Sequence, residues 1–166
     1  MKSLLLTVLL ALTAHAQETP GLTPEQVRNF VMNWYGGTND HKPVEQLLGM
    51  LAEDVVMLYP NRPEPFTGKE AFRSWYADVL RQFFDETHKV EAMDITLLDS
   101  NHAEVRVIVR WERRTWPIGE AKSKYEASLS HQRFEIARSP NDGSVCIRKK
   151  IVETFEPTAP IFGLAQ

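Results

Sequence analysis

The spacing of apolar residues changes near Phe84, and this change restricts the possible folds more than any other feature. Before it, apolar side chains recur every three or four positions, which is typical of amphipathic helices. After it, they alternate with polar side chains, which is typical of strands. Helices that precede a run of strands joined by short turns predict an α+β domain with a curved, mostly antiparallel sheet packed on N-terminal helices.

Three helices are expected in the first half of the chain. The first begins at Thr23-Pro24-Glu25-Gln26, where a capping hydroxyl, a proline at the first helical position and a reciprocal glutamine coincide. We expect Gly36-Gly37 to end it. Pro43 opens a short second helix, and a brief strand at residues 55–59 follows. The third helix starts after Gly68 and carries an aromatic ridge made of Phe72, Trp75, Tyr76, Val79 and Phe83.

Four strands are expected after the third helix, at residues 90–98, 103–114, 122–137 and 144–154. The second is the clearest, because Val105, Val107 and Val109 alternate with charged side chains. Its outward face mixes both charges around one isoleucine, which is compatible with a homodimer interface or with a solvated face. That face consists of Glu104, Arg106, Ile108, Arg110 and Glu112.

The N-terminus has the pattern of a secretory signal peptide at residues 1–16, with Lys2, an apolar run and Ala14-His15-Ala16 as the cleavage site. The apolar run is shorter than the roughly 20 residues that span a bilayer. We therefore expect a secreted or periplasmic protein with no membrane association after cleavage; the alternative is an uncleaved anchor. One domain at residues 17–156 and a C-terminal tail at residues 157–166 complete the chain.

Composition excludes several classes of function. The net charge of −3 offers no basic excess for nucleic acid. Cys146 is the only cysteine, so no intrachain disulfide can form, and its apolar neighbours predict a buried side chain. The histidines lack metal-ligand spacing, and no glycine-rich phosphate loop occurs. We expect neither a metal nor another cofactor.

Several segments resemble a known family. They are Trp34-Tyr35, Asn39-Asp40-His41, the run from Ala52 to Met57, and the helix start from Phe66 to Phe72. Together with the four-strand meander, they are similar to a SnoaL-like domain of the nuclear transport factor-like superfamily. The resemblance covers Thr23 to Glu156. It implies a cone in which a bent sheet and helices enclose a pocket, often in a dimer, and members include lyases, isomerases, cyclases and non-catalytic binding domains.

The resemblance also implies a catalytic set. His88 matches a histidine at the start of the strand after the long helix, and Asp40 and Tyr35 match its aspartate and tyrosine. A carboxylate behind an imidazole fixes its tautomer and stabilises its cation, and a tyrosine hydroxyl polarises the substrate. The alternative is that Asp40, after Gly36-Gly37, is an ordinary turn residue in solvent.

Other side chains are candidates for ligand binding. Four aromatic residues are expected to wall the pocket or to fill the core: Tyr59, Trp75, Tyr76 and Trp111. His131 interrupts the third strand of the meander, either as a ligand contact or as a hydrogen-bonded histidine on a half-buried face. Lys149 faces inward if Val145, Ile147 and Ile151 do. A one-residue bulge or the opposite register would turn it to solvent instead.

Two functions therefore remain open. One is an exported module that binds a small, mostly apolar or aromatic ligand. The other is a cofactor-free lyase, isomerase or cyclase that uses His88 with Asp40.

Overall fold

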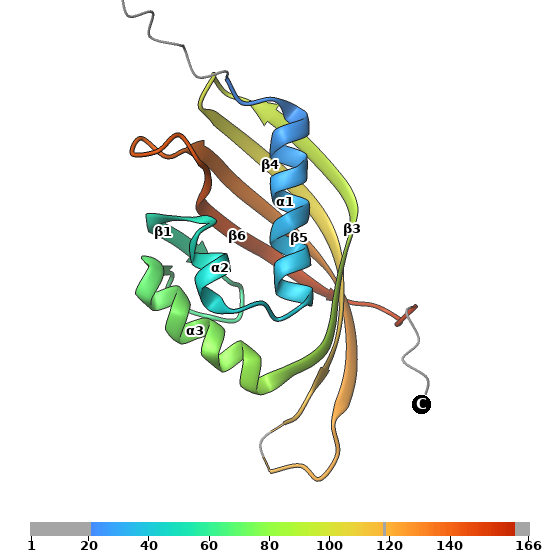
Figure 1. Ribbon diagram of the computed structural model, residues 1–166. Helices are drawn as coiled ribbons and strands as arrows, with labels where there is room; N and C mark the ends of the chain where they lie inside the picture. The colour runs from blue at the N-terminus through green and yellow to red at the C-terminus, as the bar shows by residue number, and fades with distance from the viewer. Residues whose placement is uncertain (1–20, 118, 162–166) are drawn as a thin grey trace, which may run out of the picture.

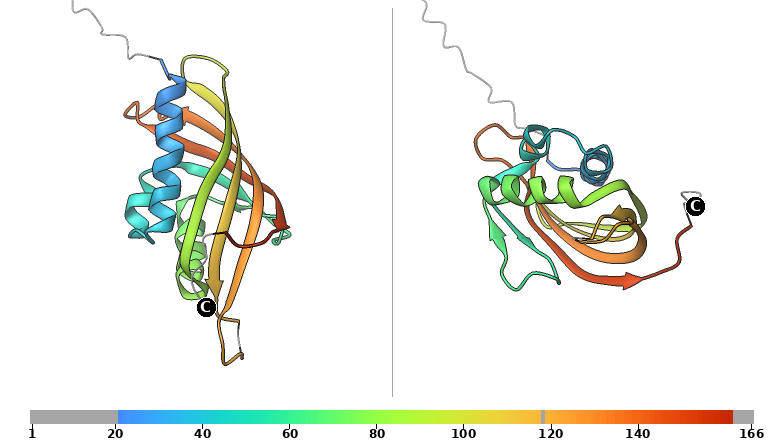
Figure 2. Two further views of the ribbon diagram at one scale, coloured as in Figure 1. Left: turned by 90° about the vertical axis from the view of Figure 1, so that its right-hand side faces the viewer. Right: turned by 90° about the horizontal axis from the view of Figure 1, so that it is seen from below.

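The computed structural model describes residues 21–117 and 119–161. One strongly curved sheet wraps around the helices (Figures 1 and 2). Along the chain, the elements are α1 (Pro24–Asn39), α2 (Val44–Leu48), β1 (Leu51–Leu58), β2 (Phe66–Thr67), α3 (Lys69–Gln82), β3 (Phe83–Leu97), β4 (His102–Thr115), β5 (Lys124–Arg138) and β6 (Val145–Pro157).

The sheet has the order β2-β1-β6-β5-β4-β3. Only the pairing of β1 with β6 is parallel; all other neighbouring strands in the described residues are antiparallel. The expected α+β class and the four-strand meander are therefore confirmed. Figure 2 shows how the long strands bend around the side of the sheet on which α1 and α3 lie.

Helix α1 begins as predicted but ends later. The Thr23 hydroxyl accepts a hydrogen bond from the backbone N–H of Gln26, and the Gln26 side chain caps Thr23 in return. The predicted end at Gly36-Gly37 is wrong, because the helix continues to Asn39. Gly37 instead allows α1 and α2 to pack closely, because a Cβ at this position would lie 2.8 Å from Cδ2 of Leu47 on α2.

The boundary between α3 and β3 also differs from the prediction. The helix ends at Gln82, so Phe83 belongs to the strand rather than to the helical ridge. A bulge follows, because Phe84 pairs with Arg114 and the next paired residue, Thr87, is opposite Glu112. Asp85 in this bulge has a positive φ of 52°. The bulge bends β3 where it leaves the helix and sets the direction of the side chains that follow.

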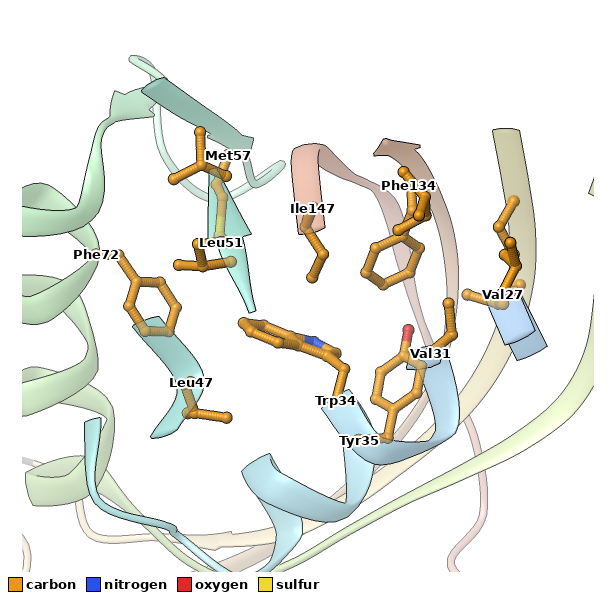
Figure 3. Close-up of a cluster of buried hydrophobic side chains, with 14 of the residues drawn as sticks. Val27, Val31, Trp34, Tyr35, Leu47, Leu51, Met57, Phe72, Phe134 and Ile147 are labelled. Carbon is orange, nitrogen blue, oxygen red and sulfur yellow. The ribbon is translucent and has the colours of Figure 1, made fainter. Parts of the chain in front are cut away.

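The core lies between α1 and the concave face of the sheet. The alternation predicted for β4 is confirmed, since Val105, Val107 and Val109 are buried. Figure 3 shows Trp34 between Leu47 and Phe72 on one side and side chains of the sheet on the other. Each such buried side chain contributes on the order of 1.5–3 kcal/mol before entropy is subtracted.

Two further expectations concern single features. Cys146 is buried and forms no disulfide, and burial raises the pKa of its thiol. Within the residues described, no helix has the length and apolar character needed to cross a membrane. The expected signal peptide and most of the C-terminal tail lie outside the described residues.

Candidate functional site

A cavity of about 230 Å³ lies between the sheet, α1 and α3. Its inner wall comes from α1, α3 and the strands β3 to β6. Four residues of its lining are exposed to solvent and mark the mouth between the β1–β2 loop and the C-terminal half of α3: Asn61, Arg62, Asp78 and Gln82.

All four aromatic residues predicted as pocket candidates line this cavity: Tyr59, Trp75, Tyr76 and Trp111. The ring centroids of Tyr59 and Trp75 are 5.1 Å apart. Trp75 also contacts Phe66 and Phe72, at centroid distances of 5.4 and 5.5 Å. Because each ring is held by another, this wall is preformed.

His88 faces the cavity, and Asn39 at the end of α1 fixes its orientation. The Asn39 Oδ1 accepts from the backbone N–H of His88 at 2.7 Å and lies 2.8 Å from Nδ1. The Asn39 Nδ2 in turn donates to the His88 carbonyl at 3.5 Å. The two backbone contacts determine which end of the amide is oxygen, so Nδ1 must carry the proton. In the neutral imidazole, Nε2 is then the free base.

The predicted contact between His88 and Asp40 is not formed. Asp40 is exposed, and Asn39, the residue before it, contacts Nδ1 of His88 instead. Successive helical residues point about 100° apart, so only one of the two can face β3. The residue that contacts His88 is therefore an amide rather than a carboxylate.

Tyr35 lies in the cavity lining, as its predicted role requires, and stacks on His88 with ring centroids 5.6 Å apart. Its hydroxyl donates to Oε1 of Gln132 at 2.9 Å. Burial raises the pKa of Tyr35 well above its usual value. The phenol is thus neutral and hydrogen-bonded to the far wall of the cavity.

Glu86 is a cavity residue that the sequence reasoning missed. Its side chain is only 3% exposed; Oε1 lies 3.1 Å from Nε2 of His41, and Oε2 accepts from Nε1 of Trp111 at 2.9 Å. Oε2 is also 3.8 Å from Nε2 of His88. Glu86 and His88 are two residues apart on one strand, so the missing signal was the early start of β3 at Phe83.

The inward lysine is Lys150, not Lys149. On β6, Ile147 pairs with Ile136 and Lys149 pairs with Glu135, so Arg148 is bulged out of the ladder. Lys149 consequently turns outward, with Nζ 3.6 Å from the Glu135 carboxylate. Lys150 lines the cavity and is 6% exposed. Of the two alternatives to an inward Lys149, the one-residue bulge is thus present.

His131 lies outside the cavity. Its side chain is 41% exposed, and Nε2 is 3.8 Å from the Glu156 carboxylate. The neighbouring Gln132 is buried and lines the cavity instead. His131 therefore does not contact a ligand bound in this cavity.

Burial controls the charge of the two basic groups in the cavity. Loss of hydration lowers the pKa of His88 to about 3, and the nearby charges of Lys150 and Arg113 add to this effect. Burial also lowers the pKa of Lys150 to about 7, opposed by the charge of Glu86. At neutral pH the imidazole is uncharged, whereas the amine is close to its midpoint. In the described part of the chain, no three acidic, histidine or cysteine side chains are grouped to hold a metal ion.

Comparison with solved structures supports the fold. A candidate scytalone dehydratase from Novosphingobium aromaticivorans superposes with a TM-score of 0.67 at 16% identity, covering 80% of this chain and 83% of that chain. A ketosteroid isomerase-like protein from Erwinia carotovora atroseptica has a TM-score of 0.62 at 16% identity, covering 81% and 95%. A hexachlorocyclohexane dehydrochlorinase has a TM-score of 0.65 at 14% identity, covering 81% and 88%.

These similarities confirm the expected cone fold, and at such low identity they concern the fold alone. No curated protein matches the sequence significantly. The sequence pattern of the SnoaL-like domain matches residues 31–143, which include α2, α3 and most of the meander. The chain therefore belongs to the SnoaL-like domain family, with the cone fold of the nuclear transport factor-like superfamily.

Proposed function

We propose that this protein binds a small, mostly apolar ligand in the cavity. The observation that carries the proposal is a preformed aromatic wall around a few convergent polar groups, which is the usual composition of small-molecule sites. A cavity of about 150 Å³ accepts benzene, whereas drug-sized ligands need about 300–1,000 Å³. A cavity of about 230 Å³ therefore suits a ligand with one or two rings.

The polar groups of the cavity would orient this ligand. Lys150 and His88 lie in the lining, while the Tyr35 hydroxyl is engaged by Gln132. The Tyr59 hydroxyl is buried and has no hydrogen-bond partner among the described residues. Unpaired buried polar atoms are rare in folded proteins and cost about 1–3 kcal/mol each, so a polar substituent on the ligand would gain from this end of the cavity.

Binding of small ring compounds tests the proposal directly. A panel of one- and two-ring compounds, beginning with 2-naphthol, would be titrated and followed by NMR. Val79 lines the cavity near its mouth, and Val79→Phe should weaken binding by about tenfold or more by filling this space. Leu80 is 42% exposed and lies outside the lining, so Leu80→Phe is the matched control.

Failure of the whole panel to bind, or equal affinity for the Val79→Phe variant, would contradict the proposal. Mass spectrometry of the purified protein would identify any natural ligand that remains bound. The mass of that ligand should correspond to one or two rings.

A second candidate function is proton transfer by His88, because this residue lines the cavity and its contact with Asn39 leaves Nε2 unprotonated in the neutral imidazole. An imidazole whose pKa is lowered to about 3 is a weak base, so it suits an acidic C–H bond beside a carbonyl. The probe is 2-tetralone, whose C1 protons exchange with D₂O on enolisation. We expect His88→Gln to abolish protein-catalysed exchange and His131→Gln to leave it unchanged. Equal exchange by His88→Gln would exclude this function.

We further propose that the protein is exported and acts outside the cytoplasm. The support is the pattern of Lys2, the apolar run and Ala14-His15-Ala16. N-terminal sequencing of the mature protein should then begin at Gln17. A mature protein that retains Met1 would contradict export by cleavage.

A further inference from the structure

Lys150 is a buried amine without a contacting anion. The residue is 6% exposed, yet no other described residue forms a hydrogen bond or an ion pair with its amine. Nζ lies instead over three aromatic rings: those of Trp34, Tyr59 and Phe134, at 5.8, 5.3 and 5.7 Å from the centroids. Cation–π contacts of this kind contribute about 0.5–2 kcal/mol, less than the several kcal/mol that burial of an ammonium group costs.

The charged groups around the cavity do not compensate for the cost of burying the ammonium group of Lys150. Tyr35 on α1, Tyr76 on α3 and Tyr59 after β1 all have raised pKa values owing to burial, so they are neutral. His88 on β3 is neutral as well. Arg62 and Asp78 lie at the exposed mouth of the cavity, and because their charges are opposite, the pair adds no net negative charge near Lys150.

Glu86 on β3 is the remaining acidic group of the lining, and its carboxylate is engaged elsewhere. One oxygen lies 3.1 Å from His41, and the other accepts from the indole of Trp111 at 2.9 Å. Glu86 therefore acts on Lys150 only through space, without a contact. The amine remains free to pair with a group that enters the cavity.

We propose that Lys150 binds an anionic substituent of the ligand, so that the ligand is a small aromatic or alicyclic carboxylate. This inference rests on the proposed ligand-binding function and specifies the class of ligand. The carboxylate would approach Nζ while the ring occupies the space between Tyr59, Trp75 and Trp111. A monoanion suits a single buried amine, whereas a phosphate dianion would require more donors than this cavity provides.

Protonation of Lys150 is coupled to such binding. A carboxylate beside Nζ stabilises the ammonium form, so the protein takes up a proton when the ligand binds at a pH where the free amine is partly neutral. A neutral ligand of the same shape produces no such uptake. Proton uptake on binding therefore distinguishes a charge contact with Lys150 from packing of the ring alone.

The experiment compares 2-naphthoate with 2-naphthamide, which share the ring system and differ in charge. Calorimetry on the wild-type protein should show naphthoate binding about tenfold or more tightly. Lys150→Met should lose this preference and still bind naphthamide, which shows that the variant retains its cavity. Lys149→Met removes the same charge one residue away, from an exposed pair with Glu135, and should keep the preference.

Titrations at about pH 8.5 in buffers of different ionisation enthalpy measure the proton uptake. We expect uptake that approaches one proton in the wild type and in Lys149→Met, and none in Lys150→Met. Equal affinity of the wild type for both compounds, or uptake unchanged by Lys150→Met, would overturn this inference and leave the proposed function intact. Binding of neither compound, nor of any other ring compound in the panel, would instead count against the proposed function.

Discussion

The Oδ1 atom of Asn39 accepts from the backbone N–H of His88 and lies 2.8 Å from its Nδ1 atom. One amide oxygen thereby joins the end of α1 to β3 and determines the histidine tautomer. An amide carries no charge, so it orients the imidazole without the charge stabilisation that a carboxylate would give to the imidazolium. The low pKa of His88 agrees with this arrangement.

Replacing this amide by a carboxylate should raise the pKa of His88. In Asn39→Asp, a negative charge would lie at the position that is now 2.8 Å from Nδ1, and opposite charges at this distance favour the protonated imidazole. NMR titration of the His88 ring protons measures the shift. Asp40→Asn is the control, because Asp40 is exposed, and it should leave the pKa of His88 unchanged. An unchanged pKa in Asn39→Asp would contradict this account of the tautomer.

His88 should make the protein sensitive to acid. Its pKa is about 3 in the folded state and 6.5 in the unfolded chain, so the unfolded chain binds more protons between these values. The free energy of unfolding therefore falls as the pH drops from 6.5 towards 3. Between pH 7 and pH 5, protonation of His88 alone should lower the free energy of unfolding by about 2 kcal/mol.

Urea unfolding at several pH values measures this loss. His88→Gln should flatten the dependence between pH 7 and pH 5, whereas His131→Gln, whose side chain is 41% exposed, should retain it. Parallel profiles for the wild type and His88→Gln would show that His88 is not the responsible group.

Lys150→Met should increase stability at neutral pH. The pKa of Lys150 is 10.5 in the unfolded chain and about 7 in the folded protein, so the unfolded state binds more protons between these values. For the wild type, stability should rise as the pH increases from 7 towards 10.5, and the methionine variant should lose this dependence. Replacing buried ion pairs by apolar residues often stabilises proteins, by up to about 4 kcal/mol, and we expect a gain within this range.

Thermal unfolding across this pH range, in the absence of added ligand, measures the effect. Lys149→Met is the matched control and should stay within about 0.5 kcal/mol of the wild type. A destabilised Lys150→Met variant at pH 7 would argue against an uncompensated charge at this position.

The two adjacent glycines of α1 should respond oppositely to alanine. Gly37→Ala places a Cβ 2.8 Å from Cδ2 of Leu47, and overpacking of this kind costs about 1–3 kcal/mol. A Cβ at Gly36 meets nothing within 4 Å, so Gly36→Ala should stabilise the helix by about 0.4–1 kcal/mol. Chemical denaturation distinguishes the two variants, and the same sign for both would contradict the packing described here.

Dimerisation through the outer face of β4 stays a prediction. Arg106 on this face pairs with Glu104 of the same strand at 3.0 Å, and its side chain is 69% exposed. If the face joins two copies, Arg106→Glu should dissociate them by placing like charges together. Sedimentation at micromolar concentration decides the question, because a wild-type protein that remains monomeric has no such interface.

Local patterns in the sequence were enough to predict the class of fold. The capping box at Thr23, the helical ridge and the alternation of Val105, Val107 and Val109 each depend on residues near one another in the chain. The four aromatic residues predicted for the pocket do line it: two lie on α3, one lies on β4, and Tyr59 lies directly after β1. Their role in binding stays a prediction.

Only the tertiary structure decided which polar side chains face the cavity. Two bulges, near Asp85 and at Arg148, shift the strand period by one residue, and this selects Lys150 over Lys149 and turns Glu86 inward. The last turn of α1 likewise selects Asn39 over Asp40. A bulge depends on pairing with distant strands, and a helix end depends on what packs against it. A shift of one residue reverses a side chain in a strand and rotates it by about 100° in a helix, so periodicity alone could not determine these positions.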